Sequence, residues 1–154
     1  MKKLDLIIDT NLLLLLVIGF LDNGNFIKKS KRLNEYDEFD YHATLTVMQD
    51  NHIHITPYIA TEVSNLIDLS GEAQTRAFEF SRILFSEFTE IKTDLNEDVK
   101  SEFFPYYGLT DSSLISLVSN YNILTHDRRL TPILYHCKGE NVIDFEVLRV
   151  ATRT

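Results

Sequence analysis

Four acidic residues stand where the local sequence predicts the end of a strand or the start of a helix. They are Asp9, Glu62, Asp111 and Asp127. In an open α/β sheet, ligands bind beyond the carboxyl ends of the strands, so we expect these side chains to meet at that edge. Carboxylates gathered at one point raise each other's pKa, and divalent cations relieve the repulsion. Since oxygen ligands suit Mg²⁺ or Mn²⁺, the pattern predicts metal-assisted hydrolysis of a phosphodiester.

The sequence around these acids predicts the elements that position them. Apolar runs predict buried strands at 4–8 and 122–125, and polar–apolar alternation predicts a strand at 52–56. Further strands are expected at 89–93, a short one, and at 141–145. Apolar spacings of three or four predict helices that begin at 12, 39, 57, 72, 96 and 111. We expect Thr10 or Asn11 to cap the first of these helices and Thr110 to cap the last. Strands alternate with helices, which predicts the α/β class, as a three-layer α/β/α arrangement with a mostly parallel sheet of about four to five strands.

Length and composition indicate one soluble globular domain, 1–154. A chain of 154 residues can bury a sizeable core, and 44% hydrophobic with 25% charged residues is ordinary for such a domain. The single cysteine, Cys137, excludes a disulfide within the chain and a cysteine-based zinc site. It fits a reducing, cytoplasmic location.

The N-terminus looks like a signal peptide but lacks its essential parts. Asp5, Asp9 and Asn11 interrupt the apolar stretch, and no small-residue cleavage site follows. The uninterrupted apolar run, 12–21, is about half of the roughly 20 residues that span a bilayer. We therefore interpret it as a buried helix and expect no membrane segment.

Positive charge is scarce, because the formal net charge is −8. This counts against a nucleic-acid partner unless metal ions offset the acids and basic residues gather locally. Arg128 and Arg129 follow Asp127 directly, and we expect them to hold a substrate phosphate. The cluster at 28–32 is denser, but such a run is more often a solvated face. The longer stretch 22–40 is interpreted as a charged insertion or mobile arm.

Tyr106 and Tyr107 are equally consistent with stacking on a base and with a packed loop.

The four acids lie in motifs that together resemble the PIN domain family of small metal-dependent nucleases. The motifs are DTN at 9–11, TPY at 56–58 followed by Glu62, GLTD at 108–111 and THD at 125–127. The resemblance extends from residue 4 to about 145. It implies that Asp9, Glu62, Asp111 and Asp127 are the catalytic acids and bind the metal. It further implies that Asn11, Thr125 or both orient the carboxylates or the attacking water. His126 could contact substrate or have no role, and we expect it to have none.

The activity implied by the resemblance is that of an endoribonuclease that requires Mg²⁺ or Mn²⁺ and hydrolyses RNA. Many small PIN proteins are toxins of toxin–antitoxin pairs, so the expected partners are an RNA substrate, a small antitoxin protein and a second copy in a homodimer. One alternative is a DNA or structure-specific nuclease with the same acids. Another is a catalytically inactive PIN-like module that binds a protein.

Each acid also has a simpler interpretation when it is taken alone. Asp111 could only stabilise the start of a helix, and Glu62 could be an ordinary solvated helix residue. Asp127 could be a turn residue beside Arg128. The functional interpretation therefore depends on whether the fold brings the four together.

Overall fold

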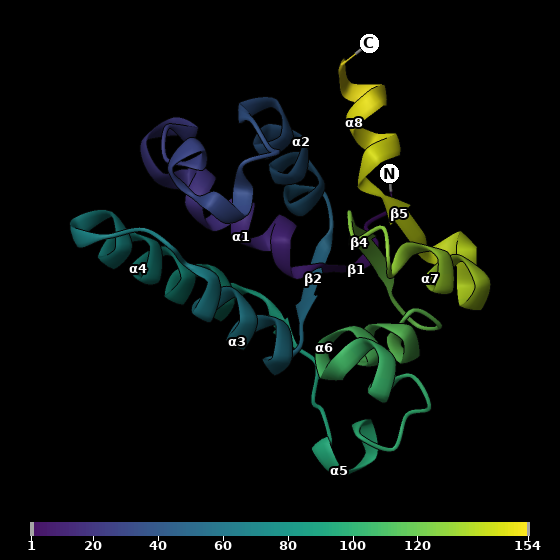
Figure 1. The fold of residues 1–154 in the computed structure, drawn as a ribbon. Coiled ribbons are helices and arrows are strands. Elements are labelled where there is room, and N and C mark those ends of the chain that lie inside the picture. The colour runs from purple at the N-terminus through teal and green to yellow at the C-terminus, as the bar shows by residue number, and fades with distance from the viewer. Residues whose placement is uncertain (1, 154) are drawn as a thin grey trace.

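The computed structural model describes residues 2–153, which contain one sheet of five parallel strands (Figure 1). The strands are β1 (Asp5–Ile8), β2 (His52–Ile55), β3 (Thr89–Glu90), β4 (Asn122–Thr125) and β5 (Val142–Asp144). Their order across the sheet is β3-β2-β1-β4-β5, and every neighbouring pair is parallel. The predicted α/β class with a mostly parallel sheet is confirmed.

The central strand, β1, sets the relation between the two halves of the chain. Its apolar residues are fully buried, and Ile8 lies in register with Leu124 of β4. The backbone N–H of Asp9 then donates to the carbonyl oxygen of Leu124 at 2.9 Å. Residues that follow β1 and β4 therefore emerge side by side, although more than a hundred positions separate them.

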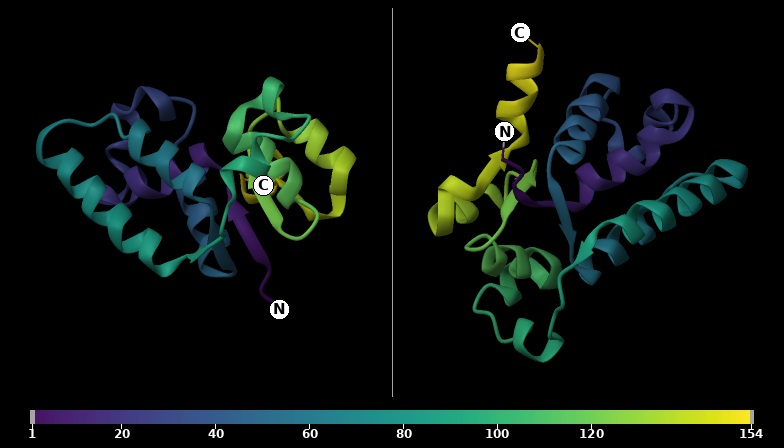
Figure 2. Two further views of the ribbon diagram at one scale, coloured as in Figure 1. Left: turned by 90° about the horizontal axis from the view of Figure 1, so that it is seen from below. Right: turned by 180° about the vertical axis from the view of Figure 1, so that it is seen from behind.

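Helices form a layer on each side of the sheet. One group comprises α1 (Thr10–Phe20), α2 (Glu38–Gln49), α3 (Pro57–Leu66) and α4 (Gly71–Glu87), and the other comprises α5 (Leu95–Asp98), α6 (Phe104–Leu117) and α7 (Thr131–Lys138). Figure 2 shows the two groups on either side of the strands. The last helix, α8 (Phe145–Arg153), follows β5 and packs against α2.

Helix α1 starts earlier than its sequence predicts. Its first residue is Thr10, and Asp9 is the cap, with a carboxylate that accepts the backbone N–H of Thr10. The strand thus passes into the helix without an intervening loop. As its nearly continuous apolar sequence predicts, α1 is buried along almost its whole length.

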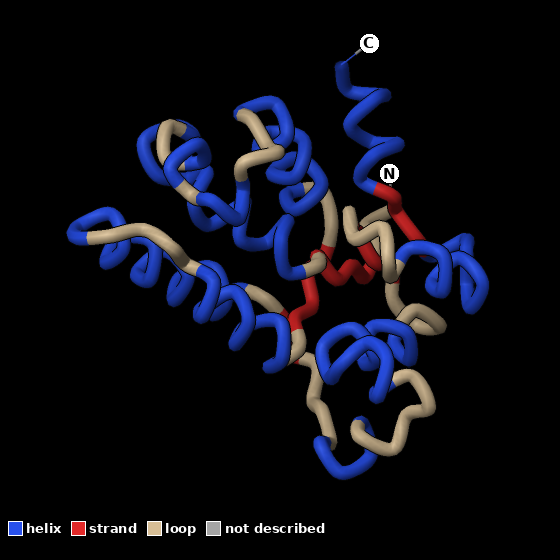
Figure 3. Tube along the Cα trace, viewed as in Figure 1, coloured by secondary structure: helices blue, strands red, loops and turns tan. Residues whose placement is uncertain are grey.

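The stretch 22–40 is folded onto the body of the domain. It forms the short 3₁₀ turns η1 (Leu21–Gly24), η2 (Ile27–Lys29) and η3 (Lys31–Leu33) before α2 begins (Figure 3). Ile27, Leu33 and Tyr36 are at most 5% exposed and belong to the core. The charged residues of this stretch are therefore carried on a packed surface rather than on a projecting arm.

A glycine divides α6 just before one of the four acids. Gly108 has φ 79°, a left-handed conformation that glycine adopts without steric cost, and the helix is kinked there. Thr110 therefore lies inside the helix that resumes after the kink, and the expectation that it caps a helix beginning at Asp111 is wrong. Its hydroxyl group is free to contact another element.

The C-terminal helices were not anticipated from the sequence. In α8, two arginines reach back to Asp40, a carboxylate that is only 2% exposed. Arg149 donates from Nε and Nη2, both at 3.0 Å, and Arg153 donates from Nη2 at 2.9 Å. These bonds attach α8 to the start of α2.

Within residues 2–153, none of the helices has the length and apolar character needed to cross a membrane.

Replacing Gly19 with Ala should destabilise the protein, because α1 and α2 approach too closely there to admit a side chain. A Cβ at Gly19 would collide with the ring of Tyr41. We expect a loss of about 1–3 kcal/mol in the free energy of unfolding, measured by denaturant titration. Gly139→Ala is the matched control, since its Cβ would meet only Tyr135 at 3.4 Å. Equal stability of the two variants would contradict the packing described.

Candidate functional site

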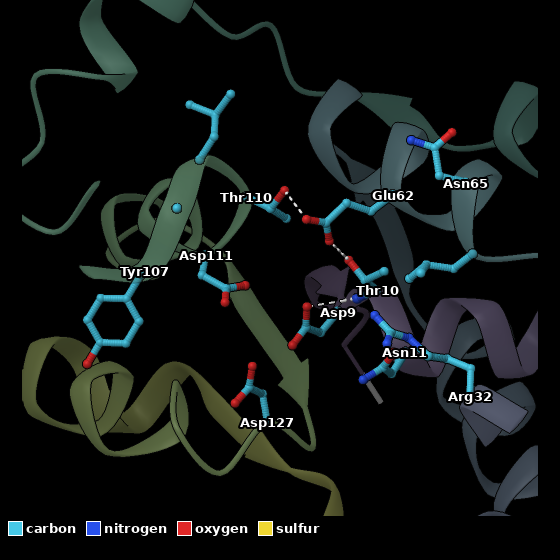
Figure 4. Close-up of a pocket in the computed structure, with 13 residues that line it drawn as sticks. Asp9, Thr10, Asn11, Arg32, Glu62, Asn65, Tyr107, Thr110, Asp111 and Asp127 are labelled. Atoms are coloured by element: carbon cyan, nitrogen blue, oxygen red, sulfur yellow. Dashed lines mark hydrogen bonds between the residues drawn. The ribbon is translucent and has the colours of Figure 1, made fainter. Parts of the chain in front are cut away.

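The four acidic side chains line one pocket of about 360 Å³ (Figure 4). Asp9 follows β1 and Asp127 follows β4, so the central pair of strands places both at the carboxyl edge of the sheet. Glu62 comes from α3 and Asp111 from α6. The fold therefore brings together the residues that the sequence motifs singled out.

Asp9 is the most enclosed of the four, with an exposed fraction of 7%. Its Oδ1 accepts the backbone N–H of Thr10 at 2.7 Å, and its Oδ2 accepts the hydroxyl of Thr125 at 2.7 Å. Burial raises the pKa of Asp9 to about 6, although the two hydrogen bonds lower it and the charges of Asp127 and Glu62 raise it further. Burial thus destabilises the ionised form of this carboxylate, and a cation beside it would relieve that cost.

Glu62 is held by two threonines from different elements. Its Oε1 accepts the hydroxyl of Thr10 at 2.9 Å, and its Oε2 accepts the hydroxyl of Thr110 at 2.8 Å. Sequence reasoning assigned neither threonine to the site. The available signal was that each adjoins one of the acids, Thr10 after Asp9 and Thr110 before Asp111.

Asp111 has a more strongly raised pKa than Asp9. Its carboxylate accepts no hydrogen bond from residues 2–153. Burial and the nearby charges of Asp9, Asp127 and Glu62 raise the pKa of Asp111 to about 7, against a lowering by Arg129. This carboxylate is therefore the one most ready to accept a cation.

Asp127 has a structural task as well as a place in the pocket. Its Oδ1 accepts the backbone N–H groups of Arg129 and Leu130, at 2.9 and 3.2 Å, in the turn before α7. The backbone N–H of Asp127 donates to Thr125 Oγ1 at 3.1 Å. Thr125 therefore links Asp9 to Asp127, consistent with the orienting role that the family resemblance implies for it.

His126 connects the loop after β4 to two distant parts of the chain. Its ring nitrogens pair with the hydroxyl of Tyr36 at 2.8 Å and with Glu146 Oε2 at 2.7 Å. The side chain is only 6% exposed. The ring faces away from solvent and fixes the loop that carries Asp127, a structural role that was not expected for it.

The basic residues near the site lie at two different hollows. Arg129 lies over the ring of Tyr107, a pocket residue, at 4.9 Å from the ring centre. Arg128 instead lines a separate hollow with residues of α7 and Glu146. Arg32, from the cluster given less weight in the sequence, lines the carboxylate pocket together with Asn11. Tyr106 is 71% exposed and is not among the residues that line the pocket.

The donor set suits a hard divalent cation, because it consists of carboxylate oxygens. In the arrangement observed, however, no three His, Cys, Asp or Glu side chains of residues 2–153 are placed so that they could hold a metal ion. Three of the four carboxylates accept hydrogen bonds from hydroxyl or backbone groups instead. Metal binding therefore requires the carboxylates to converge further.

Comparison with known proteins adds no relative, since no family model, no curated protein and no solved structure matches this chain. The fold and the pocket therefore carry the functional argument, together with the motifs.

The burial of Asp111 among other carboxylates should show as a pH-dependent gain in stability when Asp111 is replaced with Asn. The pKa of Asp111 is about 7 in the folded state and 3.8 in the unfolded reference. As pH rises between these values, the unfolded chain releases the proton first, so the wild type loses stability. In EDTA, Asp111→Asn should therefore be stabilised relative to wild type by about 2 kcal/mol more at around pH 8 than at around pH 4.

The measurement is denaturant unfolding of both proteins across this pH range. Asp50→Asn serves as the control, because Asp50 is exposed at the end of α2 and its carboxylate lies outside the pocket. A stability difference between Asp111→Asn and wild type that does not change with pH would show that Asp111 is not under electrostatic strain.

Proposed function

We propose that this protein is a metal-dependent endoribonuclease that hydrolyses phosphodiester bonds of RNA at the carboxylate pocket. The observation that carries the proposal is the convergence of Asp9, Glu62, Asp111 and Asp127, from four separate segments, on one pocket at the carboxyl edge of a parallel sheet. The resemblance of their motifs to the PIN domain family supports the same activity. A toxin role, an antitoxin partner and a homodimer stay predictions, and so does the cytoplasmic location expected from the single cysteine.

The ligands proposed for Mg²⁺ or Mn²⁺ are the four carboxylates. Such an ion, when bound, lowers the pKa of its water and offsets charge on the phosphate. Asp9 and Asp111 have the raised pKa values expected of carboxylates that gain from a nearby cation. The protein's own contribution is to hold them close in spite of their repulsion.

Threonine hydroxyls provide that positioning. Thr125 fixes one oxygen of Asp9 and leaves the other beside the start of α1. Thr10 and Thr110 orient Glu62 from opposite sides of the pocket. Residues that orient a ligand in this way typically contribute about 10–100-fold to metal affinity or activity.

The defining experiment is incubation of single-stranded RNA and single-stranded DNA with the protein in Mg²⁺, Mn²⁺ or EDTA. We expect RNA cleavage with either metal and none in EDTA. Asp9→Asn and Asp111→Asn should each lose more than about 100-fold in kcat/KM, since a ligand contributes more than the residues that orient it. Thr125→Val should lose about 10–100-fold.

Two controls separate loss of function from loss of fold. Asp50→Asn changes the same chemical group outside the pocket and should cleave as wild type. Millimolar Mn²⁺ should raise the melting temperature of wild type and raise that of Asp111→Asn less, because metal binding stabilises the folded state by mass action. Preferred cleavage of DNA would contradict the RNA assignment, and cleavage in EDTA would contradict the role of metal.

Removing Arg129 should weaken the binding of RNA more than removing Arg128. Arg129 lowers the pKa of Asp111 and lies over Tyr107 at the pocket. We expect Arg129→Ala to raise KM roughly tenfold, the equivalent of one good charge-assisted hydrogen bond to phosphate. Arg128→Ala removes the same charge from the hollow beside α7. Steady-state cleavage kinetics of the two variants decide the matter, and a larger KM for Arg128→Ala would reverse the assignment.

A further inference from the structure

Arginines without an ion-pair partner are the minority in the part of this acidic protein that the structure describes. Of its seven arginines, four form ion pairs with Asp or Glu: Arg76, Arg82, Arg149 and Arg153. Within residues 2–153, the guanidinium groups of Arg32, Arg128 and Arg129 form none. With 23 acidic residues in the chain, a guanidinium left unpaired is available for an anion from outside.

Arg32 is held at the carboxylate pocket by its own segment. It lies in η3, whose neighbouring residues Ser30 and Leu33 are fully buried. Its backbone N–H is 3.4 Å from Asp68 Oδ2, beyond the end of α3. The backbone is therefore anchored while the side chain is exposed and directed toward Asn11 (Figure 4).

Two asparagines complete the wall on which Arg32 lies. Asn11, from α1, and Asn65, from α3, line the same pocket and are exposed. Their side-chain amides make no hydrogen bond with residues 2–153. An amide offers both donors and an acceptor, which is the complement of a sugar hydroxyl or a base edge. This wall thus presents one cation and two unused amides beside the acids.

We propose that Asn11, Arg32 and Asn65 form a nucleotide subsite for single-stranded RNA, next to the phosphodiester at the carboxylates. The proposal rests on the proposed function of the pocket. Arg32 binds the phosphate adjacent to the reacting one, and a guanidinium suits this because it can hold two phosphate oxygens at once. Asn11 and Asn65 hydrogen-bond the sugar or base of the same nucleotide. Arg129 lies beside Tyr107 at the other wall, so the strand is held on both sides of the acids.

The test measures the affinity of single-stranded RNA in protein that also carries Asp111→Asn. The probe is a labelled oligouridine of about 12 nucleotides, within the roughly 4–16 that single-strand sites cover. Arg32→Ala should bind about tenfold more weakly and reduce the slope of log affinity against log salt by about 1. Asn65→Ala should also weaken binding but leave the salt slope unchanged, because it removes no charge.

Two further variants guard against indirect effects. Arg32→Lys should keep the salt slope of the parent while losing part of the affinity, since lysine keeps the charge but not the paired donors. Arg82→Ala removes an arginine that pairs with Glu79 on the surface of α4, and it should change neither quantity. Unchanged binding by Arg32→Ala, or a loss equal to that of Arg82→Ala, overturns the subsite.

Failure of the subsite can be told from failure of the proposed function. With the catalytic acids intact, Arg32→Ala should raise KM for RNA cleavage with little change in kcat, as expected for a contact made equally in the ground and transition states. Metal-dependent cleavage by this variant with an unchanged KM overturns the subsite alone. A wild type that binds the probe through Arg32 but does not cleave overturns the nuclease activity alone, and a wild type that does neither overturns both.

Discussion

Repulsion between like charges is the constraint on which this structure depends. Asp9, Glu62, Asp111 and Asp127 line a pocket of about 360 Å³, and two of them are shielded enough from water to carry strongly raised pKa values. Such an arrangement costs folding free energy in the absence of a cation. The rest of the fold has to supply that free energy, and the extensive apolar burial around β1 and α1 is the largest source available.

Neutral hydroxyl groups hold the carboxylates in place. Thr10, Thr110 and Thr125 contact the carboxylates directly, and together they join the start of α1, the start of the resumed α6 and the end of β4. A hydroxyl donates one hydrogen bond without adding positive charge, so it orients an acid without neutralising it. An arginine or lysine in the same place would lower the pKa values and compete with a metal ion for the same oxygens. The threonines therefore leave the negative charge of the carboxylates in place, and the pocket keeps its attraction for cations.

Much of this architecture was predictable because it follows from local patterns. Apolar or alternating runs between helical periodicities predicted the five strands, and residues that follow parallel strands lie at one edge of the sheet. What could not be predicted depends on distances through space. Arg128 and Arg129 are neighbours in sequence, yet Arg129 lies over Tyr107 of the carboxylate pocket whereas Arg128 lines a separate hollow beside α7. Arg32 reaches the pocket only because buried residues on either side of it fold its segment inward.

The attachment of α8 also bears on how the molecule opens locally. Terminal helices usually fray, because little is lost when they detach. Here, detachment of α8 would remove both arginines from Asp40 and leave that carboxylate, 2% exposed in the folded chain, without its counter-charges. It would also take Glu146 away from His126 and so loosen the loop that carries Asp127. Helix α8 and the loop that carries Asp127 are therefore joined through hydrogen bonds, so that local opening of one would weaken the attachment of the other.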